Sequence, residues 1–230
     1  MRYLILITLI AVIAGSAMAD DVVTMPTANQ LKKGEVDLAA YYLALDNPSA
    51  LPQNINYQTV YVGLTDNLEI DAHRADVDKD ETATVLVATY KLLSETSTTP
   101  DLVVGCRNLA GTATTLVPAL RDKSKDRSYF IAGAKTLFLN PTQPGPPLVR
   151  LHLGLGTPDW TMFNDRRHDG VFGGAQMLVK PDLGFVLQYD GENVITGIAF
   201  SPKNSGLTIK GGTFGEHTWV GVAYRKMLSY

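Results

Sequence analysis

The chain has 230 residues, with 20 lysines and arginines against 23 aspartates and glutamates, a formal charge of −3 and one cysteine. This mild acidity, without any basic cluster interleaved with aromatic residues, argues against a nucleic-acid-binding protein. Cys106 has no intrachain partner, so a disulfide framework is excluded. After residue 19 no apolar run approaches the roughly 18 residues that a membrane-spanning helix needs, which excludes helical spans.

Residues 1–19 have the three parts of a secretory signal. Arg2 supplies the positive start, Leu4 to Ile13 the apolar stretch, and Ala17-Met18-Ala19 a small-residue cleavage site. An N-terminal membrane anchor is the alternative, but the apolar run is too short to cross about 30 Å of hydrocarbon. We therefore expect export with cleavage after Ala19, a periplasmic lead-in over residues 20–33, and a folded domain over residues 34–230.

From residue 34 onward, apolar and polar residues alternate in short runs that are separated by turn sequences such as Thr65-Asp66-Asn67. Successive residues of a strand point to opposite faces, so each run predicts a strand with one apolar face. The predicted strands cover residues 34–46, 55–64, 68–77, 82–93, 101–109, 128–139, 148–156, 170–179, 183–190, 194–202, 207–214 and 218–230. A chain of this length suits one all-β domain.

An export signal, twelve such strands and an aromatic last residue predict an all-β, antiparallel up-and-down transmembrane β-barrel in the bacterial outer membrane. Both termini are then expected in the periplasm. The two longest connections, 110–127 and 157–169, fall on the same, outer side, as the extracellular loops of such barrels do. A soluble β-sandwich would show the same alternation and stays open as an alternative.

Five stretches of the chain are similar to the motifs of a known family. Residues 100–112 (PDLVVGCRNLAGT) look like its "P-x-[apolar]-x-x-G-x-R-[DN]-x-x-G-T" strand, and Met25-Pro26-Thr27-Ala28 looks like its start before the first strand. Residues 171–175 with 185–191 look like its "FGG … EYDG" hairpins, with Gln188 in place of the acidic residue, and Gly221-Val222-Ala223-Tyr224 is similar to a later strand.

By these motifs the chain resembles the YjbH-like outer-membrane proteins, a family linked to exopolysaccharide production. Members of that family tend to be longer, so this chain would be a reduced, single-barrel form. The resemblance implies an outer-membrane barrel and a tie to polysaccharide export. It carries over no catalytic residue.

In a membrane barrel the polar face of each strand lines the lumen, so the charged residues on those faces are candidate lumen residues. They are Glu35, Asp37, Glu69, Asp71, His73, Arg107, Arg150, His152, Lys210 and Arg225. Acids in the early strands facing bases in the later ones would create a transverse field that orients polar or sugar-like solutes. Alternatively the charges form salt bridges that close the pore. Arg150 and Lys210 are expected to lie in water, so that glutamate at either position would barely affect folding.

Three further groups of residues concern a loop contact, a catalytic site and a metal site. Trp160, Arg166 and Arg167 lie in the loop 157–169, where they suit either a carbohydrate contact or an anchor in the lipid headgroups. None of the four histidines has a serine within two positions, so no catalytic residue is predicted. Asp76, Asp78 and Asp80 lack the glycine and distal glutamate of a calcium loop, so we expect no metal and no cofactor.

The sequence thus predicts a non-enzymatic outer-membrane barrel that acts as a passive channel or as an accessory in the export of polar, saccharide-like solutes or exopolysaccharide. Its expected partners are outer-membrane lipid and, as candidates, polysaccharide or export machinery. Two alternatives stay open. One is a structural or interaction barrel with a closed, salt-bridged lumen, and the other is a soluble periplasmic β-sandwich binding module.

Overall fold

The computed structural model describes residues 26–44, 54–77, 81–110, 126–140, 145–158 and 168–228. Its strands are β1 (Glu35–Ala44), β2 (Asn54–Gly63), β3 (Leu68–Val77), β4 (Glu81–Leu93), β5 (Asp101–Arg107), β6 (Ser128–Phe138), β7 (Leu148–Gly156), β8 (Gly170–Lys180), β9 (Leu183–Tyr189), β10 (Val194–Phe200), β11 (Leu207–Phe214) and β12 (His217–Met227). Within these ranges there is no helix long and apolar enough to cross a membrane. The expected signal, residues 1–19, and the residues Asp78, Asp80, Trp160, Arg166 and Arg167 lie outside the described residues.

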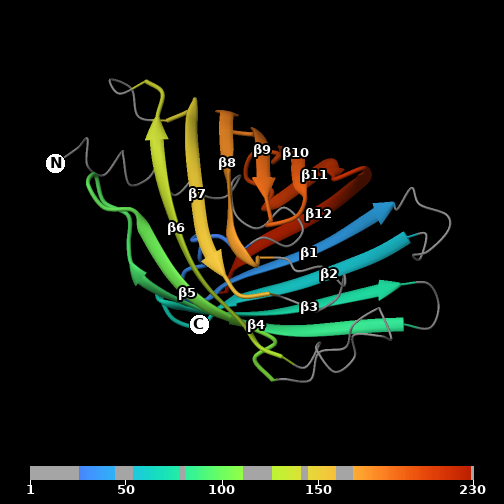
Figure 1. Ribbon diagram of the computed structural model, residues 1–230. Helices are drawn as coiled ribbons and strands as arrows, with labels where there is room; N and C mark the ends of the chain where they lie inside the picture. Colours follow the sequence, from blue (N-terminus) through green and yellow to red (C-terminus); the bar gives the residue numbers. More distant parts are fainter. Residues whose placement is uncertain are drawn as a thin grey trace.

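Each strand pairs antiparallel with its neighbour in the chain, and β12 pairs with β1, so the sheet is a closed barrel. The closing pair runs from Glu35 opposite Met227 to Ala44 opposite Thr218, and Figure 1 shows the red β12 beside the blue β1. This confirms the predicted twelve-stranded up-and-down barrel and excludes the two packed sheets of a sandwich. We call the end where β1 begins and β12 ends the near end, and the opposite end the far end.

The predicted strand bounds differ from the observed ones mainly where strands stop. The strand expected over 101–109 ends at Arg107 because Asn108 adopts a left-handed backbone with φ of 53°. The strand expected over 194–202 ends at Phe200, and the backbone N–H of Ser201 donates to the carbonyl of Asp182 in the turn between β8 and β9. Turn geometry, which alternation does not encode, sets both ends.

The outer surface of the barrel is apolar. Burial alternates along most strands, and many of the residues that point away from the barrel axis are large and exposed; Leu153 is 66% exposed. Such residues occur on most strands and include Leu38, Val60, Leu86, Ile131, Leu151, Leu155, Val171, Met177, Leu187, Ile198, Ile209, Val220 and Val222. Soluble monomers rarely expose a contiguous apolar surface of this extent, whereas hydrocarbon solvates it without cost. The barrel therefore has the exterior of a transmembrane protein.

Outward-facing aromatic residues lie near both ends of the apolar surface. Tyr42, Tyr129 and Tyr189 are exposed close to the far ends of β1, β6 and β9. Tyr90, Phe185, Phe200 and Tyr224 are exposed close to the near ends of β4, β9, β10 and β12. Aromatic side chains prefer the headgroup level on each side of a bilayer, so the two sets mark the edges of the membrane-spanning band.

Inside the barrel, rings from one strand cover glycines of another. A Cβ on Gly154 would lie 2.2 Å from ring atoms of Phe172, and a Cβ on Gly105 would lie 2.1 Å from the ring of Phe130. Gly221 leaves the same room for Tyr41. These glycines allow large side chains to lie flat against the wall, so the interior is packed rather than hollow at these levels.

Replacing Leu153 with arginine should destabilise the barrel by about 2–4 kcal/mol, because the charge would lie near the middle of the membrane-spanning band. Val194→Arg, at the far end of β10, is the matched control and should cost about 0–1 kcal/mol. Urea unfolding of both variants in liposomes, followed by heat-modifiable gel migration, measures the difference. Equal stability of Leu153→Arg and wild type would show that this face does not meet hydrocarbon.

Candidate functional site

The predicted lumen residues lie on inward faces of the strands, in a lumen that is largely closed to solvent. Asp37, Glu69, Asp71, His73, Arg107, His152 and Lys210 are buried, with 2–5% of their surface exposed. Glu35, Arg150 and Arg225 are half-buried. On β7, Leu151 and Leu153 are exposed and point outward, whereas His152 is buried and points inward.

Two of the basic lumen residues, Arg225 and Lys210, contact side chains of β1. Arg225 donates from Nη2 to Asp37 Oδ2 at 2.8 Å across the pair β1–β12. Lys210 Nζ lies 3.4 Å from the Tyr41 hydroxyl and 5.8 Å from the centre of its ring. Lys210 is therefore packed against an aromatic ring and is 5% exposed, so the expectation that it lies in water is wrong.

The segment before β1 lies inside the barrel. Residues 26–33, which we call the N-terminal segment, precede β1 and were expected as part of a lead-in outside the domain. Instead Ala28 is fully buried and Leu31 is 2% exposed, and Ala28 belongs to the same buried cluster as the inward residues Ala39 and Tyr41. The sequence prediction failed here because this segment has no strand periodicity.

Hydrogen bonds from the N-terminal segment reach strands on different sides of the barrel. The backbone N–H of Leu31 donates to Glu69 Oε2 of β3 at 2.6 Å, and Gln30 Nε2 donates to the carbonyl of Thr89 in β4 at 2.8 Å. Asn29 Nδ2 donates to Gln176 Oε1 of β8 at 3.4 Å. Because β3 and β8 are five strands apart in the ring, the segment bridges the lumen.

Arg150 joins the N-terminal segment to the near end of the wall. Its Nε donates to Asn29 Oδ1 at 2.5 Å, its Nη1 to Glu95 Oε2 at 2.6 Å and to Thr136 Oγ1 at 2.8 Å, and its Nη2 to Asp101 Oδ2 at 2.5 Å. The Arg150 side chain is 11% exposed. The expectation that Arg150 lies in water is therefore wrong, because two carboxylates replace the water. We call these five residues the Arg150 network.

Glu95 is the member of this network that lies in a turn, between β4 and β5. It accepts from the backbone N–H of Thr136 at 2.7 Å and lies 3.4 Å from Lys135 Nζ. Burial raises the pKa of this carboxyl, but the hydrogen bonds from Thr136 and the charge of Arg150 outweigh it and hold the pKa below its ordinary value of 4.5. Glu95 is therefore ionised at neutral pH and ties this turn to β6 and β7.

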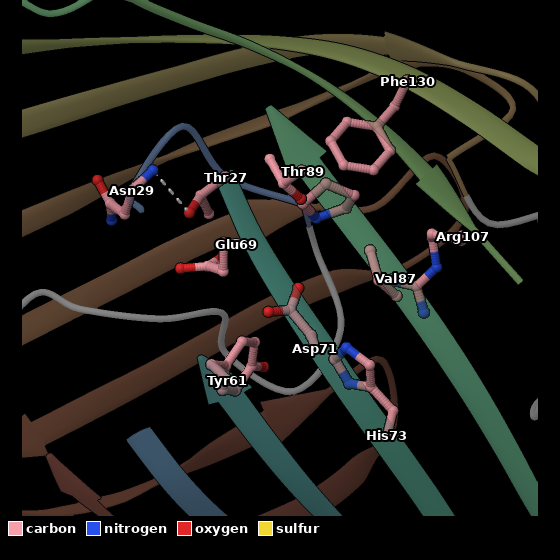
Figure 2. Close-up of a pocket in the computed structure, with 11 residues that line it drawn as sticks. Thr27, Asn29, Tyr61, Glu69, Asp71, His73, Val87, Thr89, Arg107 and Phe130 are labelled. Atoms are coloured by element: carbon pink, nitrogen blue, oxygen red, sulfur yellow. Dashed lines mark hydrogen bonds between the residues drawn. The ribbon is translucent and has the colours of Figure 1, made fainter. Parts of the chain in front are cut away.

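A small polar cavity lies beside the N-terminal segment. It has a volume of about 20 Å³ and, as Figure 2 shows, Thr27 and Asn29 face Glu69, Asp71 and His73 across it. Tyr61, Val87, Thr89, Arg107, Phe130 and Pro26 complete its lining. This volume holds about one water molecule and is far too small for a sugar. Beside the described part of the N-terminal segment, this cavity therefore admits water but no larger solute.

Toward the far end the interior changes from polar to apolar. Leu43, Ile55, Ile195, Phe214 and Trp219 point inward from β1, β2, β10, β11 and β12 and are 0–5% exposed. Tyr41 packs between Tyr57 and Trp219, with both pairs of ring centroids 6.1 Å apart. Tyr57 in turn bonds through its hydroxyl to His73 Nδ1 at 2.6 Å. An aromatic layer therefore lies between the charged residues and the far end of the barrel.

Sequence reasoning missed several residues of this site. Asn29, Glu95, Asp101 and Gln176 stand in the lead-in, in a turn, at a strand start and in a glycine-rich strand, where no pattern of charges singles them out. Only the motif Met25-Pro26-Thr27-Ala28 drew attention to the segment before β1. The described residues contain no group of three or more histidine, cysteine or acidic side chains that could hold a metal ion.

Comparison with known proteins finds similarity to solved structures alone. No family model and no curated protein matches the chain. Among solved structures it is similar to the KdgM porin, with 12% identity, a TM-score of 0.49, and coverage of 83% of this chain and 98% of that one. It is also similar to the COG4313 outer membrane channel from Pseudomonas putida F1 (15% identity, TM-score 0.45, 91% and 100% covered) and to the N-terminal β-barrel domain of Pseudomonas aeruginosa OprF (9% identity, TM-score 0.27, 85% and 100% covered).

Replacing Arg150 with alanine should lower the free energy of unfolding by about 3 kcal/mol, because it removes the buried guanidinium that pairs with both Glu95 and Asp101. Arg74→Ala is the matched control. Arg74 pairs with Asp76 on the surface, with 56% of its side chain exposed, and its loss should cost under about 1 kcal/mol. Urea titration of refolded protein measures both values; equal values would contradict the buried network.

Glu95→Gln should cost stability at neutral pH but not in acid. A carboxyl whose pKa is lowered on folding stabilises the protein above its ordinary value of 4.5, and this contribution is lost as the pH falls through the lowered pKa. The gap in unfolding free energy between wild type and Glu95→Gln should therefore shrink steadily below pH 4.5. Urea titrations from neutral pH downward test this, and a gap independent of pH would contradict it.

Proposed function

We propose that the protein is an outer-membrane β-barrel that passes polar, saccharide-like solutes, as a passive channel or as an accessory in exopolysaccharide export. The apolar exterior between two aromatic belts supports the location, together with the export signal expected over residues 1–19. The resemblance to YjbH-like proteins over residues 100–112 and 185–191 supports exopolysaccharide as the class of solute.

The observation that carries the proposal is the charged lining of a barrel that could have been filled with apolar residues. Burying an ion pair costs desolvation, and apolar residues of similar volume often stabilise an interior as well or better. Glu69, Asp71 and Arg107 are each 4% exposed, inside a wall whose outer face is already apolar. Stability alone does not account for them, whereas contact with polar solutes does.

A second candidate is a structural or interaction barrel whose lumen never opens. The observation that favours it is the filling of the interior at two levels, by the N-terminal segment at the near end and by Tyr41, Tyr57 and Trp219 toward the far end. The two functions differ in one measurable property, which is conductance.

Purified protein in planar bilayers should show discrete openings, rare in the wild type because the described lumen is filled. Asp71→Asn should lower the preference of these openings for cations and Arg107→Gln should raise it, because both side chains face the lumen. Reversal potentials in a salt gradient measure the preference. Arg74→Ala, on the outer surface, is the control and should leave it unchanged. Openings that ignore both lumen substitutions would argue against a path along these residues.

A further inference from the structure

We propose that the N-terminal segment is a displaceable plug that closes the near end of the lumen, held there by contact with Gly63 and by Arg150. This inference rests on the proposed channel function, because a plug regulates a barrel only if the lumen can conduct. The part that moves is the N-terminal segment, and the wall of the barrel stays in place.

The N-terminal segment is separate from the wall. The β1 strand pairs with β12 from Glu35 onward and with β2 from Val36 onward, so the barrel closes without any residue that precedes Gly34. The described bonds of residues 29–31 to the barrel wall are single contacts to scattered strands rather than a ladder. Withdrawal of the segment would therefore cost these hydrogen bonds and the burial of Ala28 and Leu31, and it would leave the sheet intact.

Gly63 makes room for the segment where it leaves the lumen. The residue lies on the inward face at the near end of β2, and a Cβ there would lie 2.1 Å from the carbonyl oxygen of Lys32 and 2.7 Å from its carbonyl carbon. Both are backbone atoms that no rotamer change can move. The backbone N–H of Gly34 also donates to the carbonyl of Gly63 at 2.8 Å. Any side chain at position 63 must therefore displace the segment.

Arg150 holds the segment from the opposite side. Its Nε donates to Asn29 of the segment, while its Nη1 and Nη2 atoms are held in place by Glu95 and Asp101. A guanidinium held in this way offers a fixed donor, so its side chain loses little additional conformational freedom when Asn29 binds. The polar cavity lined by Thr27, Asn29, Glu69 and Asp71 would then open toward the near end when Asn29 is released.

The experiment compares Gly63→Val and Arg150→Ala with wild type, in full-length refolded protein checked by heat-modifiable migration. Gly184→Ala is the matched control, because it adds a methyl group inside the near end of the barrel at ordinary contact distance, 3.5 Å from the Met177 carbonyl. Release of the segment is read by maleimide labelling of Thr27→Cys in a Cys106→Ser background, and opening is read by planar-bilayer conductance.

We expect Thr27→Cys to be labelled about tenfold faster or more with Arg150→Ala, which removes a charge-assisted hydrogen bond, and with Gly63→Val, whose side chain overlaps the Lys32 carbonyl. With Gly184→Ala it should be labelled at the wild-type rate. Conductance should rise in the same two variants. Equally slow labelling in wild type and both variants would overturn the plug. Equally fast labelling in all three, with equal conductance, would overturn it as well and leave the channel standing. Faster labelling without conductance would support a displaceable segment and remove the proposed channel function.

Discussion

The pairing of β12 with β1 is the constraint on which the rest of the structure depends. In hydrocarbon no water is present to satisfy a backbone N–H or carbonyl, so a sheet can cross a membrane only if no edge is left open. Closure fixes the direction of every side chain, because alternate residues must point to lipid or to the lumen. The apolar exterior follows from this alternation. The inward side chains, in turn, leave a lumen that must be filled by other groups or by water.

The interior is filled in two different ways. Toward the far end, aromatic rings lie over glycines of neighbouring strands, and packing supplies the contacts. Toward the near end, a segment from outside the sheet enters the lumen and is bound by polar groups. The aromatic rings belong to the wall itself, whereas the segment is separate from the wall and its hydrogen bonds to the wall can be exchanged for bonds to water.

The Arg150 network shows how these polar contacts are shared. One guanidinium bonds to the N-terminal segment, to a turn and to two strands, so its desolvation is offset by four hydrogen bonds. The same geometry makes the closed state dependent on groups that titrate or can be solvated. A lumen closed by charges and amides, rather than by apolar packing alone, is compatible with a protein whose interior meets polar solutes in another state.

By itself, the sequence determined the strands, their outward faces and the barrel, because a period of two along each run is a local property that closure preserves. It also identified ten charged residues on the polar faces. Only the tertiary structure decided which of them meet: Arg150 and Asn29 are 121 residues apart, and nothing local to either predicts their bond. The insertion of residues 26–33 was decided in the same way. That segment has no periodicity, and its place depends on the space that Gly63 leaves and on partners supplied by β3, β4, β7 and β8.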